Sequence, residues 1–318
     1  MMRFIAGKFL HLIIVVLAVS AITFVMLDLL PVSIAHEIGG QGATSGDITA
    51  IRDRLGLDAP ALVRFGRWLA DVLHGDLGTS FSSGQPVGAA IRAHLPVTFE
   101  LLVLAQFLAL ALAVPVGIFS AWRAGSRFDR LFGTIGFALS SIPNYALAIV
   151  LIFIFSIRLK WFPATGYTPL SDGIWANLRG FVLPALSIAL IEWVILMRVL
   201  RNDMIATLKE DYILLARAKG LPTWRILLRH ALRPSCFSMI TLLGIHVGNL
   251  IGGAVIIENL FALPGIGRLL LSGIFAQDFP MVQGCVLIIS TGYVAVNFLV
   301  DASYGLLDPR VRKEGAGG

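Results

Sequence analysis

The 318-residue chain is 57% hydrophobic, and only 14% of its residues are charged, against about a quarter in a typical soluble domain. A chain of this length cannot build a core large enough to bury so much apolar surface, whereas a bilayer removes that need. The composition therefore excludes an ordinary soluble protein and predicts an all-α membrane protein. The net charge of +6 does not indicate nucleic-acid binding, because cytoplasmic loops rich in Lys and Arg account for it.

Six apolar stretches are each long enough to cross the hydrocarbon core of a bilayer, which takes about 20 residues. The first stretch is too long for a cleavable signal peptide and lacks a small-residue cleavage site, so we expect it to stay in the protein as a helix. The six predicted transmembrane helices are Phe9–Leu30, Leu101–Trp122, Leu131–Ile157, Phe181–Met197, Phe237–Ile257 and Met281–Val300.

Basic residues gather on one side of these six stretches. Sixteen of the 25 Lys and Arg residues lie at the two ends of the chain or after the second and fourth stretches, and four lie in the short connections on the other side. Because cytoplasmic loops hold the excess of positive charge, we expect both termini in the cytoplasm. The chain then divides into residues 1–100, the first helix with a structured external loop; 101–310, a five-helix core; and 311–318, a cytoplasmic tail.

The long connection Pro31–Glu100 falls on the external side, and a loop of that length usually has structure of its own. Within it, apolar residues recur at helical spacing, which predicts a helix over Ala59–His74. Glycines after His74 end this helix. Its apolar face would consist of Leu62, Phe65, Trp68, Leu69 and Val72.

The cytoplasmic connection at residues 202–233 is the most informative part of the sequence. Helical spacing predicts a helix that ends at Gly220 and a second helix that Pro222 opens. The apolar face of the first helix would consist of Ile205, Leu208, Tyr212 and Leu215. That of the second helix would consist of Trp224, Leu227, Leu228 and Ala231.

Two small residues, Ala216 and Gly220, lie four apart and hence on one face of the first helix. They would leave a shallow surface that the side chains of another protein can approach closely. The basic residues around it are Arg217, Lys219, Arg225, Arg229 and Arg233. The residues alone leave two interpretations open, namely a docking surface for a cytoplasmic partner and a basic loop on anionic headgroups.

Polar residues inside the predicted helices are candidates for a translocation path. Glu192 is the one charge well inside a stretch, and such residues often line a path; the alternative is a partner within the bundle, such as Arg198. His246 either meets a divalent ion or its chelate, or bonds a neighbouring helix. Weaker candidates are Asn144, Asn249 and Gln106.

The sequence lacks the usual residue patterns of enzymes. It has no GxxxxGK[ST] loop for ATP, no nucleophile–base set and no metal-ligand cluster by spacing, so we expect no catalytic residue and no cofactor in this chain. The two cysteines, Cys236 and Cys285, lie at or in apolar stretches and form no CxxC pattern. A membrane enzyme is therefore disfavoured.

The stretch Asp211–Leu221 resembles the coupling loop of ABC importer permeases. That loop has the pattern Glu-Ala-Ala, three residues, Gly, of which this chain keeps Ala216 and Gly220 but has Leu214 and Leu215 in the first two places. Further stretches resemble the peptide/nickel branch of the family in the same order along the chain, although Leu30–Ser33 departs from it. These stretches are Gly56–Asp58, Gly75–Ser80, Leu95–Thr98, Trp161–Tyr167, Ile257–Phe261, Pro264–Gly267 and Leu307–Arg312.

The resemblance implies the type I importer permease fold with six helices, in a bacterial cytoplasmic membrane. It implies four kinds of partner: a homologous second permease, two cytoplasmic ATPase subunits that bind ATP and Mg²⁺, an external solute-binding protein and the lipid bilayer. It also implies that the ATPases dock at Ala216, Arg217, Ala218, Lys219, Gly220 and Leu221. A stand-alone channel or secondary transporter would leave this loop unexplained.

Three stretches resemble nickel permeases most closely, namely Ser141–Tyr145, Gly244–Gly253 and Ile256–Phe261. They lead to the expectation that the cargo is nickel or a nickel chelate. The alternative is a dipeptide or oligopeptide, because both kinds of permease share this scaffold.

Overall fold

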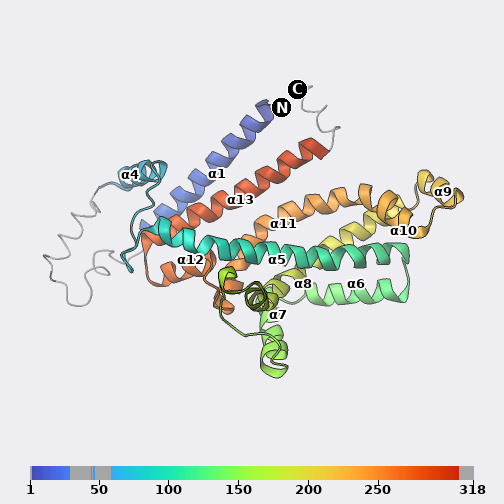
Figure 1. Ribbon diagram of the computed structural model, residues 1–318. Coiled ribbons are helices and arrows are strands. Elements are labelled where there is room, and N and C mark those ends of the chain that lie inside the picture. The colour runs from blue at the N-terminus through green and yellow to red at the C-terminus, as the bar shows by residue number, and fades with distance from the viewer. Residues whose placement is uncertain (1, 29–43, 45, 47–58, 308–318) are drawn as a thin grey trace. The chain divides into compact units, whose positions relative to one another are not determined.

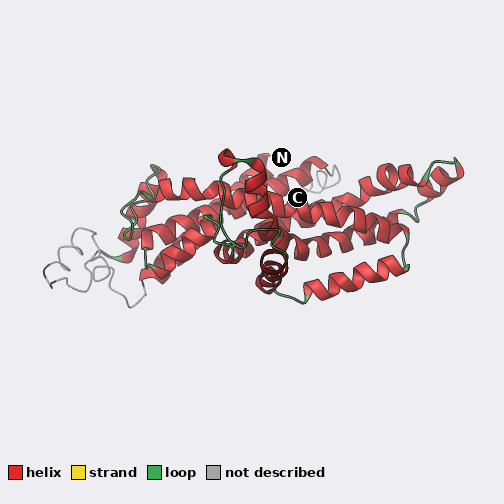
Figure 2. Cartoon of the chain, turned by 60° about the horizontal axis from the view of Figure 1, so that its bottom comes forward, coloured by secondary structure: helices red, strands yellow, loops and turns green. Residues whose placement is uncertain are grey.

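The computed structural model describes residues 2–28, 44, 46 and 59–307. Regular structure in these residues is helical (Figure 2), apart from one isolated bridge between Thr79 and Pro86. The α-helices of Figure 1 are α1 (Met2–Asp28), α4 (Ala61–Leu73), α5 (Val87–Trp122), α6 (Arg127–Ser140), α7 (Asn144–Leu151), α8 (Ile174–Thr207), α9 (Asp211–Ala218), α10 (Thr223–Arg225), α11 (Leu232–Leu260), α12 (Ile266–Phe275) and α13 (Phe279–Leu307). Short π- and 3₁₀-helices are η1 (Ile152–Arg158), η2 (Leu170–Asp172) and η3 (Ile226–Ala231).

Within the described residues, three helices are long and apolar enough to cross a membrane by themselves: α5, α8 and the first part of α13. Up to five segments qualify if each of two bent helix pairs is one span. In α1, the fully described part Leu12–Met26 is an apolar helix of fewer than 18 residues, so the span expected there stays a prediction. The all-helical fold is confirmed, while the count of six and the cytoplasmic termini stay predictions.

The stretch Leu131–Ile157 is not the single continuous helix that its composition predicts. Helix α6 ends at Ser140, and the chain bends by 106° before α7 and η1 continue. Pro143 caps the start of α7, and a proline disfavours helical backbone in the residue before it. The apolar run therefore contains a corner, which hydropathy alone does not detect.

The described chain forms two compact units, and helix α5 belongs to both of them. Its residues up to Thr98 lie in the first unit, and those from Phe99 lie in the second. The first unit takes in the described residues up to Thr98 together with Pro264–Ala302. In it, Phe24 of α1 meets Phe65 of α4 edge-on, with ring centroids 5.5 Å apart. A second contact joins α13 to α5, where Gly284 lies directly against the buried side chain of Val87.

The helix expected over Ala59–His74 is present as α4, and its end next to His74 is confirmed. Four of the five residues on its expected apolar face are partly buried, whereas Leu62 is 85% exposed. Phe65 also stacks on Trp68 at 5.8 Å. The periodicity therefore identified the packed face of α4 correctly over all but its first turn.

The second unit, Phe99–Leu263, packs around α8. Small residues of α5, such as Ala109 and Ala113, are fully buried with large residues of α8, such as Met197 and Leu200. Gly117 of α5 lies so close to α8 that a Cβ there would be 3.3 Å from the Met197 carbonyl oxygen. Such close backbone approach is how helices associate in a bilayer, where lipid offers no hydrophobic driving force between them.

Candidate functional site

The segment predicted to face the cytoplasm, residues 202–233, begins within the last two turns of α8, which ends at Thr207. The turn Leu208–Glu210 separates α8 from the eight-residue helix α9. This turn resets the helical register, so the expected apolar face does not continue into α9, although its first members, Ile205 and Leu208, do pack against the core. Ile213 and Ala216 are the buried residues of α9, whereas Tyr212 and Leu215 are 45% and 57% exposed.

Gly220 ends α9 through a specific hydrogen-bonding pattern. Its backbone φ is +74°, a left-handed conformation that glycine adopts without steric penalty. The amide of Leu221 donates to the Ala216 carbonyl at 3.2 Å, and the amide of Gly220 donates to the Arg217 carbonyl at 2.9 Å. These two bonds form a Schellman motif, which satisfies carbonyls that the helix end leaves free.

A second short helical segment follows Pro222, as the sequence predicts. It consists of α10 and η3 and leads directly into α11. Of its expected apolar face, Leu227 and Ala231 are buried, but Trp224 and Leu228 are 60% and 51% exposed. Ile226 is also buried, against α9.

The two segments hold each other through a small apolar core. Ile213 and Ala216 of α9 pack against Ile226 of η3, and the Tyr212 hydroxyl donates to the His230 carbonyl at 3.3 Å. Partial burial, and then the charge of Glu210, raise the pKa of Tyr212. The pair is therefore a folded unit that is attached to α8 on one side and to α11 on the other.

This unit carries an exposed surface, which we call the α9–α10 surface. The expected shallow face at Ala216 is wrong, because Ala216 is only 5% exposed and points into the small core. Exposed apolar side chains lie around it instead: Tyr212, Leu214, Leu215, Trp224 and Leu228. Exposed basic residues accompany them: Arg217, Lys219, Arg225 and Arg229. Apolar side chains rimmed by charge are typical of protein-binding surfaces.

Two of the candidate path residues meet between α8 and α11. Nδ1 of His246 lies 3.5 Å from Oε2 of Glu192, and Glu192 is only 5% exposed. Its other carboxylate oxygen has no hydrogen-bond partner among the described residues. The alternative of a partner within the bundle is met, but the partner is His246 of α11 and not Arg198, which is exposed.

The remaining candidates lie on α7, on α11 and, for Gln106, on α5. Asn144 opens α7, and its amide nitrogen lies 3.4 Å from where a Cβ on Gly253 of α11 would be. Asn249 is part of α11, but its side chain lies outside what the structure describes. Across the described residues, no group of three or more His, Cys, Asp or Glu side chains could hold a metal ion.

A polar cluster in the first unit has no counterpart among the sequence predictions. The buried carboxylate of Asp278, just before α13, accepts hydrogen bonds from both the Ser80 and Ser82 hydroxyls and from the amide of Phe81. About two hundred residues separate the partners along the chain, so no local pattern reveals the pairing. The cluster ties the turn before α5 to the start of α13.

The Asp278 cluster predicts a pH-dependent stability. Burial alone would raise the pKa of Asp278, but the hydrogen bonds from Ser80, Ser82 and Phe81 outweigh it, and the pKa is lowered. A lowered pKa means that the stabilisation is complete above the pKa of the unfolded chain and is lost as pH falls through that of the folded state. We expect Asp278→Asn to reduce hydrogen-exchange protection of residues 79–84 at pH 7 by at least about tenfold.

The matched control is Asp71→Asn, which removes an exposed carboxylate from α4. Protection measured from pH 7 to 3, corrected for the intrinsic exchange rate, should stay level in the wild-type chain and then fall only below about pH 4. In Asp278→Asn it should be low at every pH. Equal protection in the variant and the wild type at pH 7 would contradict the assignment.

Comparison with known families accounts for most of the chain. Residues 113–313 match the family described as "Binding-protein-dependent transport system inner membrane component", and residues 1–102 match the N-terminal family of the same membrane components. The chain is 41% identical to a putative peptide transport system permease protein of Brucella abortus, over 94% of this chain and 95% of that protein.

Two further relatives are similar over nearly their full lengths. One is a dipeptide transport system permease protein of Alkalihalophilus pseudofirmus, 32% identical over 98% of this chain and 100% of the relative. The other is a probable D,D-dipeptide transport system permease protein of Escherichia coli, 37% identical over 96% of both chains. The chain therefore belongs to the family of inner membrane permease components of binding-protein-dependent ABC transport systems.

Proposed function

We propose that this chain forms the transmembrane path of an ABC importer for peptides. The family supplies the membrane-spanning component of such importers and not the ATPase. The observation that carries the peptide assignment is the set of full-length relatives, whose names are those of peptide and dipeptide permeases. The expectation of nickel rested on three short stretches and gains no support from these relatives, so we adopt its alternative.

The α9–α10 surface is the proposed docking site for a cytoplasmic ATPase. The surface offers apolar side chains for burial and basic ones for pairing with acidic groups, which gives affinity and orientation respectively. In this proposal two basic residues, Arg217 and Lys219, contact the ATPase directly. The other residues of the loop give the unit its shape: Ala216, Ala218, Gly220 and Leu221. One such surface in each of two homologous permeases would accommodate two ATPases, and an external binding protein would deliver the peptide.

The Glu192–His246 pair is the proposed polar part of the path. Glu192 is buried and holds Nδ1 of His246, while the His246 side chain is 21% exposed. A carboxylate that engages one ring nitrogen fixes the orientation of the imidazole and leaves the other nitrogen for a passing substrate. Asn144 and Asn249 are proposed to extend this polar strip. In the uptake assay described next, unchanged peptide affinity and rate in His246→Ala would remove His246 from the path.

Reconstitution tests the proposed function. The chain is placed in proteoliposomes with its second permease, both ATPases and the binding protein, and uptake of a labelled dipeptide is compared with uptake of radioactive nickel. We expect ATP-dependent dipeptide uptake that unlabelled dipeptide blocks and nickel does not. ATP-dependent nickel uptake without peptide uptake would overturn the assignment, and uptake without the ATPases would favour a channel or secondary transporter.

A further inference from the structure

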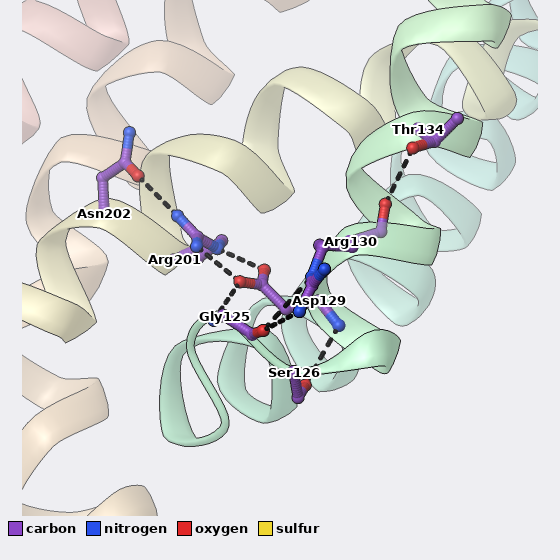
Figure 3. Close-up of polar contacts among 7 residues, drawn as sticks. All are labelled: Gly125, Ser126, Asp129, Arg130, Thr134, Arg201 and Asn202. Atoms are coloured by element: carbon purple, nitrogen blue, oxygen red, sulfur yellow. Dashed lines mark hydrogen bonds and ion pairs between the residues drawn. The ribbon is translucent and has the colours of Figure 1, made fainter.

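A charge pair joins the start of α6 to the end of α8 in the second unit. Arg201 of α8 donates from Nε and from a terminal guanidinium nitrogen to the two carboxylate oxygens of Asp129, at 2.6 and 2.7 Å (Figure 3). The amide of Gly125 donates to the same carboxylate at 2.8 Å. Two parallel bonds fix the angle between the two side chains as well as their distance.

Capping of α6 does not require this charge pair. The Ser126 hydroxyl already caps the helix by accepting from the Asp129 amide, at 3.3 Å. The Asp129 carboxylate is instead committed to Arg201 and to the tight turn at Gly125, and its side chain is only 8% exposed. Burying a carboxylate is costly unless it is hydrogen-bonded and paired with a charge. The contacts of Asp129 therefore serve to link α6 to α8 and not to cap α6.

Further contacts extend this link along both helices. Phe132 of α6 meets Trp193 of α8 edge-on at 6.3 Å. One turn further, a Cβ on Gly136 would lie only 2.9 Å from a methyl group of Val194. Helix α6 therefore packs closely against α8 over two turns, and the Asp129–Arg201 pair lies at one end of this helix contact.

The end of the contact that holds the Asp129–Arg201 pair is close in the chain to the α9–α10 unit. Arg201 is less than two turns before the end of α8 at Thr207, and α9 starts at Asp211. The Thr207 hydroxyl also lies 3.0 Å from that of Ser235 on α11. A displacement of α9 therefore reaches α8 and α11 directly, and the Asp129–Arg201 pair connects α6 to α8 at the end nearest α9.

From this geometry we infer that the Asp129–Arg201 pair makes α6 move with α8 when the α9–α10 surface is displaced, and that both residues are positioning residues for the coupling of ATP hydrolysis to transport. The inference rests on the proposed docking of an ATPase at that surface. A pair that only stabilised the fold would lower ATP hydrolysis and transport together. A pair that transmits motion lowers the amount of peptide moved per ATP.

The first test measures peptide uptake and ATP hydrolysis in the same proteoliposomes for Asp129→Asn and Arg201→Ala. We expect the ratio of peptide moved to ATP hydrolysed to fall at least tenfold, with binding-protein-stimulated hydrolysis within twofold of wild type. Arg201→Lys, which keeps the charge but loses the bidentate geometry, should fall in between. The control is Arg198→Ala, one turn earlier on α8 and exposed, which should leave the ratio unchanged.

The second test does not depend on the identity of the cargo. Spin labels are placed at Phe137 on α6 and Ala206 near the end of α8, both exposed, in a chain whose two cysteines are replaced by serine. In the assembled transporter, ATP should leave the distance between the labels unchanged, and in Asp129→Asn it should change or broaden that distance. In the first test, the inference would be overturned if both variants kept the wild-type ratio of peptide moved to ATP hydrolysed, or if they lost hydrolysis and uptake in parallel. In the second test, it would be overturned if the distance between the labels stayed as constant in Asp129→Asn as in the wild type. Absence of ATP-dependent peptide uptake by the wild type would instead count against the proposed function alone.

Discussion

Replacing Gly220 by valine should reduce ATP-driven peptide uptake to background while leaving the chain inserted in the membrane. The backbone φ of +74° costs a residue with a Cβ about 1–2 kcal/mol, and more if it is β-branched. Relief of this strain returns φ to negative values, which breaks the Schellman bonds from Gly220 and Leu221 and turns α9 away from α10. The α9–α10 surface then no longer has the shape on which an ATPase would dock.

No heavy atom lies within 4 Å of a Cβ at Gly220, so the effect comes from the backbone and not from a clash. Gly75 provides a matched control, since it also follows a helix end, has a φ of +86° and has open space around it. Gly75→Val should insert and transport. Uptake by Gly220→Val at the wild-type rate would refute the coupling assignment, and equal loss in both variants would point to general strain.

The largest expected loss of stability comes from Gly284→Ala in α13. The added Cβ would lie 2.5 Å from Cγ1 of Val87, a buried residue at the start of α5. Atoms do not approach this closely, so α13 or Val87 must shift, and overpacking of this kind costs about 1–3 kcal/mol. We expect a reduction of about 2 kcal/mol in the free energy of unfolding in mixed micelles, after allowing for the higher helix propensity of alanine.

A second glycine on α13 separates the clash from the propensity effect. Gly292 has no heavy atom within 4 Å of its Cβ position, so Gly292→Ala should be neutral or stabilising by up to about 1 kcal/mol. Combining Gly284→Ala with Val87→Ala removes the opposing methyl groups and should recover much of the loss. Equal unfolding free energies for the two single variants would mean that α13 does not pack on α5 at Val87.

Features that depend on residues close in the chain were predictable from the sequence. Helix α4, the glycine end of α9 and the helical start after Pro222 follow from spacing and from the backbone preferences of glycine and proline. The apolar stretches also identified where helices lie, because hydropathy reports composition over some 20 residues. The division of the chain into domains stays a prediction. The structure expected for residues 31–58 of the external loop lies outside the described residues, apart from 44 and 46.

Features that depend on the path of the chain in space were not predictable. Leu208–Glu210 forms a turn without glycine or proline, so the register change that buries Ile213 instead of Tyr212 has no strong local signal. Arg201, the partner of Asp129, and Ser80–Ser82, the partners of Asp278, lie far away along the chain, and a single sequence contains no trace of such pairing. Glu192 was recognised as a buried charge, but its partner on α11 was found only once the helices were placed.

The inward packing of Ala216 has a consequence for cells that hold several related importers. The small residues that mark the loop in the sequence hold the two short helices together, and exposed side chains such as Leu214, Leu215 and Trp224 form the surface. In the docking proposed above, recognition of the correct ATPase depends on exposed residues, which can be exchanged without disturbing the core between the two helices. Crosstalk between parallel transport systems can thus be suppressed by changing a few outward side chains, while the signature of the loop stays the same.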